Sequence, residues 1–538
     1  MPHPIGDHAL LADGRTAALL DPEGEVAWLC WPRVDSDACL LALLDPRQGG
    51  TFALRPRGEG VVEAREYSVG LALRTVWRQH RGRLQVDEAL STDGRPGLLR
   101  MLRAEGAPVL VEVRFRPAFA FATSPATVTE TGRRAVAAGG GIVLAVDAPA
   151  PWRIEDGVAV CIFKVVPGYP TAVALGEAAD AVGLGDAPER MAATLRHWRA
   201  TEAAVTIAAN PAALCGRALG LEAATRMRLR AAAVLTGLRQ RGGGIVAAPT
   251  TSIPQGGGGG RTWDYRYAWL RDTALAAQAL LHLGLVDDAH GLGAFCGDVC
   301  LEFAAPPPLV RVDESPPPPE RELVHLSGYG GAAPVRVGNL AAGMLQLDTA
   351  GEVLELAWEL YCARALPESL RRAIPSLARL AAERAEQPDH GIWEVRGDPL
   401  RYTHSAVLAW SGLRRAAALT AAGVCAGAAA AWATAAARIR ARLLAQCAGG
   451  QGLQLLDRGG GPDAALSQAV LLGLFDPGDP CARATVGAIA TTLGRSAGTD
   501  RYQGRPDGND APCAPFVFPA FWLAAAEEMC GLDGVPRF

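Results

Sequence analysis

The spacing of apolar residues changes partway along the chain, near Pro211, and this change limits the folds that the chain can adopt. Before it, apolar and polar residues alternate in short runs, a period of two that is typical of strands with one buried face. In the clearest run, 109–116, Val109, Val111 and Val113 alternate with mostly polar neighbours. Similar runs, separated by turns that contain Gly or Pro, lie at 72–77, 141–146 and 158–166. Together these strands predict an antiparallel β-sandwich.

After Pro211 the spacing becomes that of helices. In the segment 368–386, Leu370, Ile374 and Leu377 fall on one face, which is typical of an amphipathic helix packed on a core. Other helical segments are expected at 214–241, 273–285, 340–366, 405–421 and 428–448. We therefore expect a β-sandwich domain, residues 1–205, followed by an all-α domain, residues 206–538, with a site built from the loops at one end of the helices.

Composition and charge exclude several classes of partner. Apolar residues make up 49% and charged residues 20% of the 538-residue chain, which are ordinary values for a soluble globular protein. The formal net charge of −4 provides no basic field, so neither nucleic acid nor an anionic membrane surface is an expected partner. The long uncharged run 416–437 is mostly alanine and is interrupted by Gly423 and Gly427. It predicts two helices joined by a turn rather than a membrane span.

Neither an export signal nor a cofactor site is predicted. Residues 1–14 lack the basic start and apolar run of a signal peptide, so a cytoplasmic location with reduced cysteines is expected. The glycines at 256–260 are not followed by the Lys-Ser/Thr of a phosphate loop. No cluster of metal ligands is apparent either, since the Asp-Gly-Asn-Asp at 507–510 lacks the later Glu of a calcium loop.

The stretch 262–272 concentrates residues suited to sugar binding. Its sequence, Thr-Trp-Asp-Tyr-Arg-Tyr-Ala-Trp-Leu-Arg-Asp, holds two Trp, two Tyr, two Arg and two Asp in a chain that is only 6% aromatic. Aromatic faces stack on the C–H face of a sugar, and Arg and Asp form charged hydrogen bonds with its hydroxyl groups. A helix start whose aromatic residues pack in the core would have the same composition. From composition alone, both interpretations stay open.

Several further motifs accompany this stretch. They are Asp-Gly-Arg-Thr-Ala-Ala-Leu at 13–19, Trp-Leu-Cys-Trp-Pro-Arg-Val-Asp-Ser at 28–36, Pro-Val-Arg-Val-Gly-Asn at 334–339, Asp-His-Gly-Ile-Trp-Glu-Val-Arg-Gly at 389–397, Arg-Tyr-Thr-His-Ser at 401–405 and Asp-Arg-Tyr at 500–502. Each motif alone is weak, but in this order, over essentially the whole chain, they resemble glycoside hydrolase family 15. That family contains glucoamylases, glucodextranases and bacterial trehalases.

The resemblance implies both a fold and a reaction. The fold is an N-terminal antiparallel β-sandwich followed by an all-α (α/α)6 barrel, with the site at the mouth of the barrel. The reaction is the inverting hydrolysis of α-glucosidic bonds, in trehalose or α-glucan oligosaccharides. In such hydrolysis one carboxylic acid protonates the leaving oxygen, and a second carboxylate, roughly 6.5–9.5 Å away, activates a water molecule on the opposite face of the sugar.

The resemblance also implies roles for particular residues. The family's proton donor is a Glu directly after a Trp in a loop like 391–394, so Glu394 is the candidate general acid. Burial beside Trp393 would raise its pKa, whereas a solvated Glu394 paired with Arg396 is the structural alternative. The candidate substrate-binding residues are Arg271 and Asp272 on the non-reducing glucose, Tyr265 and Trp269 at the same subsite, Trp393 and Arg396 in the loop of the acid, Arg501 on the next sugar, and Arg336, Asn339 and His404, for which structural hydrogen bonding is the alternative.

The second carboxylate of the family is not matched. The family's base is a Glu in a late segment of the form Gly-Leu-Leu-Ser-Glu-Glu, beyond the stretch that resembles 521–524, and this chain ends at Phe538. Glu527 and Glu528 fall at the wrong place in the motif order to replace it. We therefore expect a barrel without its last helices, with an exposed apolar flank that favours self-association into a homo-oligomer.

Three hypotheses follow from the unmatched base. The first, which we favour, is a glucosidase whose base comes from Asp507, Asp510 or a partner subunit. The second is an enzyme that uses Glu394 only as a proton donor, in the cyclisation, isomerisation or dehydration of a small polar metabolite. The third is a non-catalytic carbohydrate-binding or regulatory protein.

Overall fold

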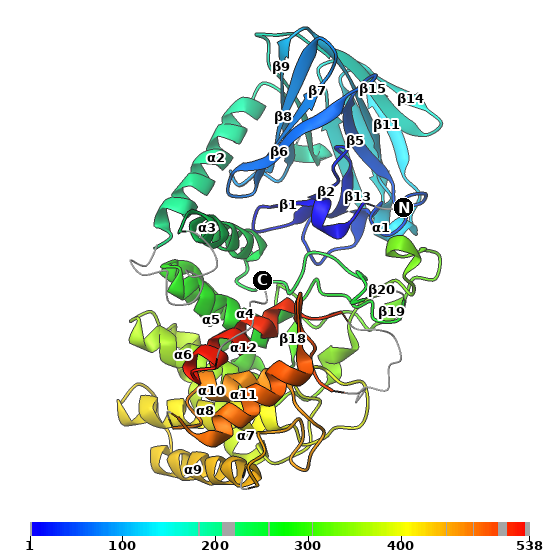
Figure 1. Ribbon diagram of the computed structural model, residues 1–538. Coiled ribbons are helices and arrows are strands. Elements are labelled where there is room, and N and C mark those ends of the chain that lie inside the picture. Colours follow the sequence, from blue (N-terminus) through cyan, green and yellow to red (C-terminus); the bar gives the residue numbers. More distant parts are fainter. Residues whose placement is uncertain are drawn as a thin grey trace.

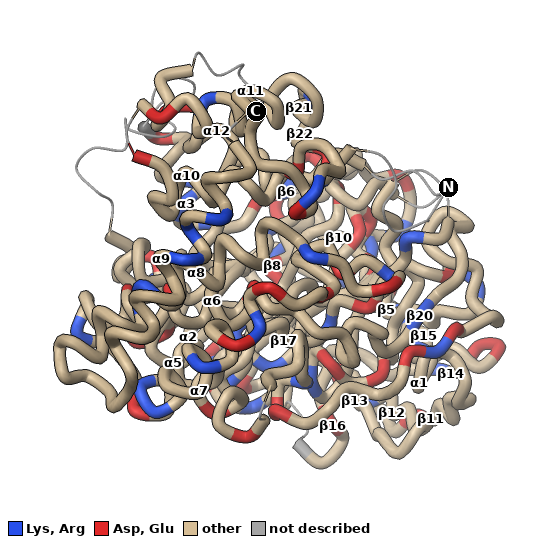
Figure 2. Tube along the Cα trace, turned by 90° about the horizontal axis from the view of Figure 1, so that it is seen from below, with Lys and Arg blue, Asp and Glu red and all other residues tan. Residues whose placement is uncertain are grey.

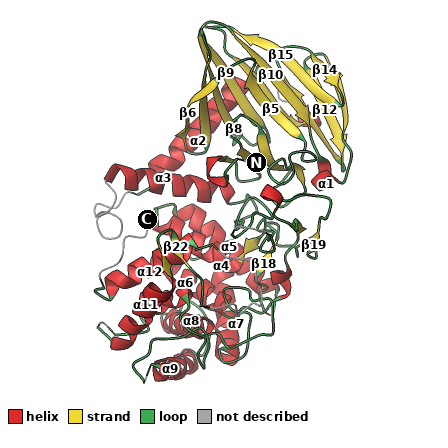
Figure 3. Ribbon diagram, turned by 45° about the vertical axis from the view of Figure 1, so that its right-hand side comes forward, coloured by secondary structure: helices red, strands yellow, loops and turns green. Residues whose placement is uncertain are grey.

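The computed structural model describes residues 3–180, 183–206, 221–256, 259–303, 305–447, 449–476, 478–503 and 514–532. Strands gather in the N-terminal part of the molecule and helices in the C-terminal part (Figures 1 and 3). The predicted succession of a β-sandwich and a helical domain is therefore confirmed.

Three antiparallel sheets form the N-terminal part. The first has the order β1-β2-β3-β4, with strands Ala9–Ala12, Ala17–Leu20, Val26–Cys30 and Ala38–Leu40. The second has the order β14-β15-β10-β5, with strands Trp152–Glu155, Val158–Val165, Val109–Arg116 and Thr51–Pro56. The third has the order β11-β12-β13-β16-β9-β8-β7-β6, with strands Thr127–Thr131, Arg134–Gly139, Ile142–Asp147, Thr171–Glu177, Leu98–Gly106, Gly82–Leu90, Ala72–Arg78 and Val61–Val69.

Strand β10 shows how the sequence produces the sandwich. Val111, Val113 and Phe115 are fully buried, whereas Leu110, the residue before Val111, is 38% exposed. Because successive side chains of a strand point to opposite faces, one face of β10 lies in the core between the sheets and the other faces solvent. The other three runs with a period of two form β7, β13 and β15, so these expectations are confirmed.

Helix α2 (Ala187–Ala204) lies along the side of the strands, and helix α3 (Leu221–Leu238) lies between the strands and the remaining helices (Figure 1). Helix α2 packs on β6, β8, β9 and β16, and α3 packs on α2, on β1 and on α4. The proposed domain boundary at residue 205 adjoins residues that the structure does not describe, and it stays a prediction.

The remaining helices form two layers. They are α4 (Leu270–His282), α5 (Val286–Glu302), α6 (Asp348–Cys362), α7 (Glu368–Arg384), α8 (Thr403–Ala421), α9 (Ala429–Gln446), α10 (Ser467–Leu471), α11 (Pro480–Leu493) and α12 (Val517–Met529). Alternate helices pack side by side, α4 on α6 and α6 on α8 in one layer, α5 on α7 and α7 on α9 in the other. This alternation is the arrangement expected of a barrel of helical hairpins. The predicted turn within 416–437 is confirmed, because α8 ends at Ala421 and α9 begins at Ala429.

One helix prediction is wrong in a way that matters for the site. The segment 340–366 was expected to be helical throughout, but α6 begins only at Asp348. The side chain of Asn339 caps a short 3-10 turn, Leu340–Gly343, and Met344 is extended. Residues 345–347 then direct their polar groups toward the loop 389–391 rather than into a helix.

The surface carries charges of both signs, and α12 carries an apolar stripe. Basic and acidic residues are interspersed along the trace in Figure 2, in keeping with the small net charge. On α12, Phe521 is 47% exposed and Met529 is 61% exposed. The cysteines within the described ranges are all free thiols. None of the helices that the structure describes has the length and apolar character needed to cross a membrane.

The contact between α6 and α8 supplies a stability prediction. A Cβ at Gly351 of α6 would collide with the backbone carbonyl of Leu408 in α8. We expect Gly351→Ala to separate the two helices and lower the free energy of unfolding by about 1–3 kcal/mol, seen as a lower melting temperature. Gly487→Ala in α11 is the matched control, because nothing lies within 4 Å of its added Cβ and Ala favours a helix. Equal melting temperatures for the two variants would contradict the close packing.

Candidate active site

A cavity of about 570 Å³ lies among the loops that connect the helices, with Ile5 of the N-terminal part also in its wall. The predicted site residues that line it are Tyr265, Trp269, Arg271, Asp272, Asn339, Trp393, Glu394, Arg396 and Arg501. Arg336 and His404 do not line it. Residues more than 200 positions apart in the sequence, such as Tyr265 and Arg501, therefore meet at one cavity.

Glu394 occupies a strained turn at the wall of this cavity. Its φ of +55° is a left-handed conformation that costs a non-glycine residue about 1–2 kcal/mol. The turn is closed by a hydrogen bond from the Glu394 amide to the carbonyl of Gly391, and Gly391 itself has a φ of +62°. A Cβ at Gly391 would lie 2.8 Å from the ring of Tyr402, so only glycine fits there. The backbone thus holds the carboxyl group of Glu394 toward the cavity.

Two donors contact the same oxygen of Glu394. The indole N–H of Trp269 donates to Oε1 at 2.6 Å, and the guanidinium of Arg271 donates to Oε1 at 3.3 Å. Burial raises the pKa of Glu394, while Arg271 and the hydrogen bond from Trp269 act in the opposite direction. Trp269 is only 1% exposed, so it serves less as an open stacking surface than as the donor that orients Glu394.

Arg271 and Asp272 form a charged part of the cavity wall. The guanidinium of Arg271 lies 3.4 Å from the carboxylate of Asp272, and the Asp272 side chain is 38% exposed. The ring of Tyr265 lies beside that of Trp269, with centroids 5.8 Å apart, and its hydroxyl accepts a hydrogen bond from Gln255. A cationic donor, an anionic acceptor and aromatic rings are therefore adjacent, as the recognition of a sugar requires.

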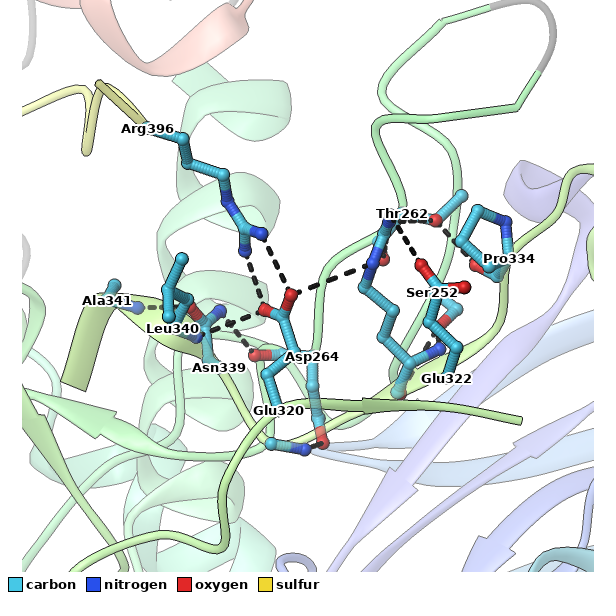
Figure 4. Close-up of polar contacts among 12 residues, drawn as sticks. Ser252, Thr262, Asp264, Glu320, Glu322, Pro334, Asn339, Leu340, Ala341 and Arg396 are labelled. Atoms are coloured by element: carbon cyan, nitrogen blue, oxygen red, sulfur yellow. Dashed lines mark hydrogen bonds and ion pairs between the residues drawn. The ribbon is translucent and has the colours of Figure 1, made fainter. Parts of the chain in front are cut away.

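Arg396 does not pair with Glu394, so that structural alternative is wrong. Its guanidinium forms two hydrogen bonds to Glu320, at 2.8 and 2.6 Å (Figure 4). The same guanidinium lies 3.7 Å above the ring of Trp263. Glu394 instead accepts its hydrogen bonds from Trp269 and Arg271. Arg396 instead fixes the loop of the acid to the segment around residue 320.

Three further candidates hold the loops in place. Arg336 donates to the carbonyl oxygens of Gly260 and Thr262. The side chain of Asn339 donates to the carbonyl of Asp264 and caps the following turn (Figure 4). His404 is 1% exposed and bonds through Nε2 to Gln468 at 2.6 Å, and burial lowers its pKa, so the ring is neutral. Structural hydrogen bonding, the alternative that the sequence left open, accounts for these contacts.

Trp393, the residue before Glu394, lies beside Arg501 in the cavity wall. The indole N–H of Trp393 donates to the buried carboxylate of Asp463 at 2.8 Å. The guanidinium of Arg501 lies over the rings of both Trp393 and Phe516, at 5.7 and 4.9 Å from their centroids. Asp463 was missed in the sequence because nothing near it repeats a recognisable motif, whereas its partner Trp393 was found.

The carboxylates of the described cavity wall are Asp272 and Glu394. Both lie beside the same guanidinium nitrogen, Nη2 of Arg271. Glu527 and Glu528 are on α12 and do not line the cavity. Asp507 and Asp510, the other proposed sources of a base, lie outside the described residues. Within the described ranges no group of three or more His, Cys, Asp or Glu side chains could hold a metal ion.

The fold and this cavity are those of a glycoside hydrolase built from a β-sandwich and a helical barrel. Two family models match the chain: "Glycosyl hydrolases family 15" over residues 223–502, and "Trehalase-like, N-terminal" over residues 1–162. A trehalase of Mycobacterium tuberculosis is 32% identical, over 97% of this chain and 81% of that protein. The chain belongs to glycosyl hydrolase family 15, and it is an enzyme that acts on sugar substrates.

Other comparisons agree with this assignment. Trehalase 1 of Sulfolobus acidocaldarius is 28% identical over 77% of this chain and 70% of that protein. The crystal structure of a bacterial glucoamylase complexed with acarbose superposes with a TM-score of 0.66, at 14% identity, over 94% of this chain and 82% of that chain. The fold is therefore shared with a glucoamylase, and the expected (α/α)6-barrel class is confirmed.

The hydrogen bond between Trp269 and Glu394 gives a testable expectation. Trp269→Phe keeps a ring but removes the donor, so we expect kcat to fall about tenfold because the acid is less well oriented. Loss of a donor to the charged form should also raise the pKa of Glu394, and the alkaline limb of the pH–rate profile should move upward.

Trp152→Phe is the matched control for this variant. The indole of Trp152 is buried in the sandwich and donates to the carbonyl of Arg133 at 3.1 Å, far from the cavity. Its loss should leave the pH–rate profile unchanged. An unchanged profile for Trp269→Phe as well would show that its indole does not act on Glu394.

Proposed function

We propose that this enzyme hydrolyses the α-glucosidic bond of trehalose with inversion, and that Glu394 is the general acid. The observation that carries the proposal is the carboxyl group of Glu394, which lines the cavity while both of its donors contact Oε1. In a neutral carboxyl group the carbonyl oxygen is the better acceptor, so the oxygen that accepts both hydrogen bonds is the one without the proton. The proton of the neutral acid therefore belongs on Oε2, where it can be delivered to a glycosidic oxygen.

The raised pKa of Glu394 suits this role. A general acid must be protonated when the substrate binds, and an ordinary glutamic acid is ionised at neutral pH. Burial raises the pKa of Glu394, so a larger fraction of the carboxyl group is neutral at a given pH. The acid is active below its pKa, and activity is lost as the pH rises through it.

The neighbouring residues support a subsite for glucose. Arg271 and Asp272 offer a charged donor and an exposed charged acceptor to sugar hydroxyl groups, and Tyr265 offers a ring beside them. Arg501, with Trp393 and Phe516, supplies a second group of side chains further along the wall for the leaving sugar. Trehalose is the proposed substrate because the relatives from M. tuberculosis and S. acidocaldarius are named as trehalases.

The base is the part of the mechanism that the described wall does not supply. Asp272 shares Nη2 of Arg271 with Glu394, so the two carboxylates lie on the same side of the cavity. Inversion requires a base on the opposite face of the sugar. We therefore propose Asp507 or Asp510 for this role, or a carboxylate of a partner subunit.

The role of Glu394 is tested by Glu394→Gln, which keeps the shape of the side chain but cannot donate a proton as an acid. We expect kcat on trehalose to fall roughly 10²- to 10⁴-fold, with a small change in KM. Glu528→Gln, an exposed carboxyl on α12, is the control and should retain full activity. Wild-type kcat for Glu394→Gln would reject Glu394 as the acid.

The wild-type protein, Glu394→Gln and Arg271→Ala together separate the two alternative functions. An enzyme that uses Glu394 only as a proton donor for another reaction would release no glucose from trehalose, maltose or isomaltose, even as the wild-type protein. A non-catalytic sugar-binding protein would bind trehalose equally well with Glu394→Gln, and would lose binding with Arg271→Ala.

The base is tested by Asp507→Asn and Asp510→Asn, each compared with the other. We expect one of them to lose roughly 10²- to 10⁴-fold in kcat and its neighbour to stay near the wild type. With trehalose, inversion gives one α- and one β-glucose per molecule cleaved, which NMR distinguishes before mutarotation. Full activity in both variants would assign the base elsewhere, and release of two α-glucose molecules would contradict inversion.

Two predictions from the sequence remain proposals. We propose a cytoplasmic location, and we propose that copies of the chain associate through the apolar stripe of α12.

A further inference from the structure

The guanidinium of Arg271 has two edges with different partners. Its Nη2 faces the cavity, 3.3 Å from Glu394 and 3.4 Å from Asp272. Its Nη1 faces away, 3.3 Å from the side-chain oxygen of Gln346 and 3.5 Å from the carboxylate of Asp348. Gln346 and Asp348 are not assigned any role in the mechanism above. Their position suggests that they determine how much of the positive charge of Arg271 acts on Glu394.

Asp348 is a buried counter-ion of Arg271. Its side chain is 1% exposed, and neither of its oxygens accepts a hydrogen bond from the residues that the structure describes. It is the first residue of α6, where the helix dipole favours a negative charge. A buried carboxylate without hydrogen bonds is costly unless it is paired, and Arg271 is the cation within ion-pair distance in the described structure.

Gln346 links Arg271 to the loop of the acid. Its side-chain oxygen accepts from Arg271, and its side-chain nitrogen donates to the carbonyl of Gly391 at 3.0 Å. Gly391 begins the turn that ends at Glu394. One amide side chain thus fixes both the guanidinium and the turn that carries the carboxyl group.

The other ionisable groups around this pair do not replace Asp348. On α6, burial and the nearby charge of Asp348 raise the pKa of Glu352 to about 8, so in the wild-type protein it is mostly neutral at pH 7. On α8, burial lowers the pKa of His404, which is also neutral there. In the loop before the acid, burial and the nearby Asp348 raise the pKa of Asp389 to about 7, and its Oδ2 is occupied by the Leu347 amide and the Ser405 hydroxyl. On α4, Asp272 faces the cavity edge of the guanidinium.

We propose that Asp348 and Gln346 are positioning residues for the acid: they hold the far edge of Arg271 and balance its charge, so that Glu394 keeps its proton. The inference rests on the proposed role of Glu394. Without the charge of Asp348, the guanidinium of Arg271 has Glu394 and Asp272 as its ion-pair partners in the described structure. It then stabilises the ionised form of Glu394 and lowers its pKa. Because the acid works only while protonated, the alkaline limb of activity moves to lower pH.

The test is the pH dependence of kcat/KM on trehalose. For Asp348→Asn we expect the alkaline limb to shift down by about one pH unit, with activity retained at acidic pH. Glu352→Gln is the matched control, since it makes the same change of acid to amide one helical turn away, at a group that is neutral at pH 7. Its alkaline limb should not move. An unshifted limb for Asp348→Asn, or the same shift in both variants, would overturn the proposal.

A second variant, for which the expected shift of the alkaline limb has the opposite sign, tests the proposal if Asp348→Asn does not fold. Gln346→Glu places a negative charge at Nη1 of Arg271, so the alkaline limb should shift upward, even though kcat falls because the hydrogen bond to Gly391 is lost. A downward shift or no shift would contradict the proposal. Glu394→Gln separates this outcome from failure of the proposed function: if that variant is inactive and the limbs do not move, only the roles of Asp348 and Gln346 are rejected.

Discussion

The charge of Arg271 is the constraint on which the rest of the site depends. A guanidinium whose side chain is only 12% exposed needs carboxylates and acceptors around it, and they come from different parts of the chain. Asp272 follows it on α4, Asp348 begins α6, and Glu394 comes from the loop before α8. Arg271 thereby connects α4, α6 and the loop before α8 at the end of the helices where the cavity lies.

The stretch 262–272 serves both the cavity and the junction with the sandwich. Trp263 and Tyr265 line the cavity, whereas Asp264 and Arg266, which alternate with them, are buried. Arg266 pairs with Asp264 at 2.7 Å and donates to the carbonyl of Ser36 in the N-terminal part. Three of the eight charged and aromatic residues of this stretch, Asp264, Arg266 and Tyr267, are buried and do not line the cavity, so the core-packing interpretation from composition is partly correct. The sugar-binding interpretation stays a prediction.

The loop of the acid is held from both sides. Asp389 accepts from the Leu347 amide and the Ser405 hydroxyl, and the His390 amide donates to the carbonyl of Leu345. On the other side, Arg396 is paired with Glu320. These contacts hold Glu394 in a left-handed conformation that an isolated loop would not keep.

The sequence predicted those features that repeat along the chain or that stand inside a motif. Apolar periods of two and of 3.6 predicted the positions of strands and helices, as β10 and α7 show. The Trp-Glu motif identified Glu394 as the candidate acid. The role of Trp269 as a donor was not predictable, because it depends on the distance between two segments 125 residues apart. Gln346 and Asp348 were overlooked because 340–366 has the composition of a helix, whereas hydrogen bonds from residues 346 and 347 to the distant loop 389–391 delay the start of that helix to Asp348. Arg336, Asn339 and His404 stand in motifs, yet a motif does not reveal their partners, which include backbone groups, Glu322 and Gln468.

The central claim is that Glu394 is held as a protonated acid by its burial. The most direct test is to titrate its carboxyl group by infrared difference spectroscopy between the wild-type protein and Glu394→Gln, so that the other buried acids cancel. The account predicts that the signal of the protonated carboxyl persists well above pH 4.3, roughly the pKa of an exposed glutamic acid. A carboxylate signal that is already complete near that pH would contradict it.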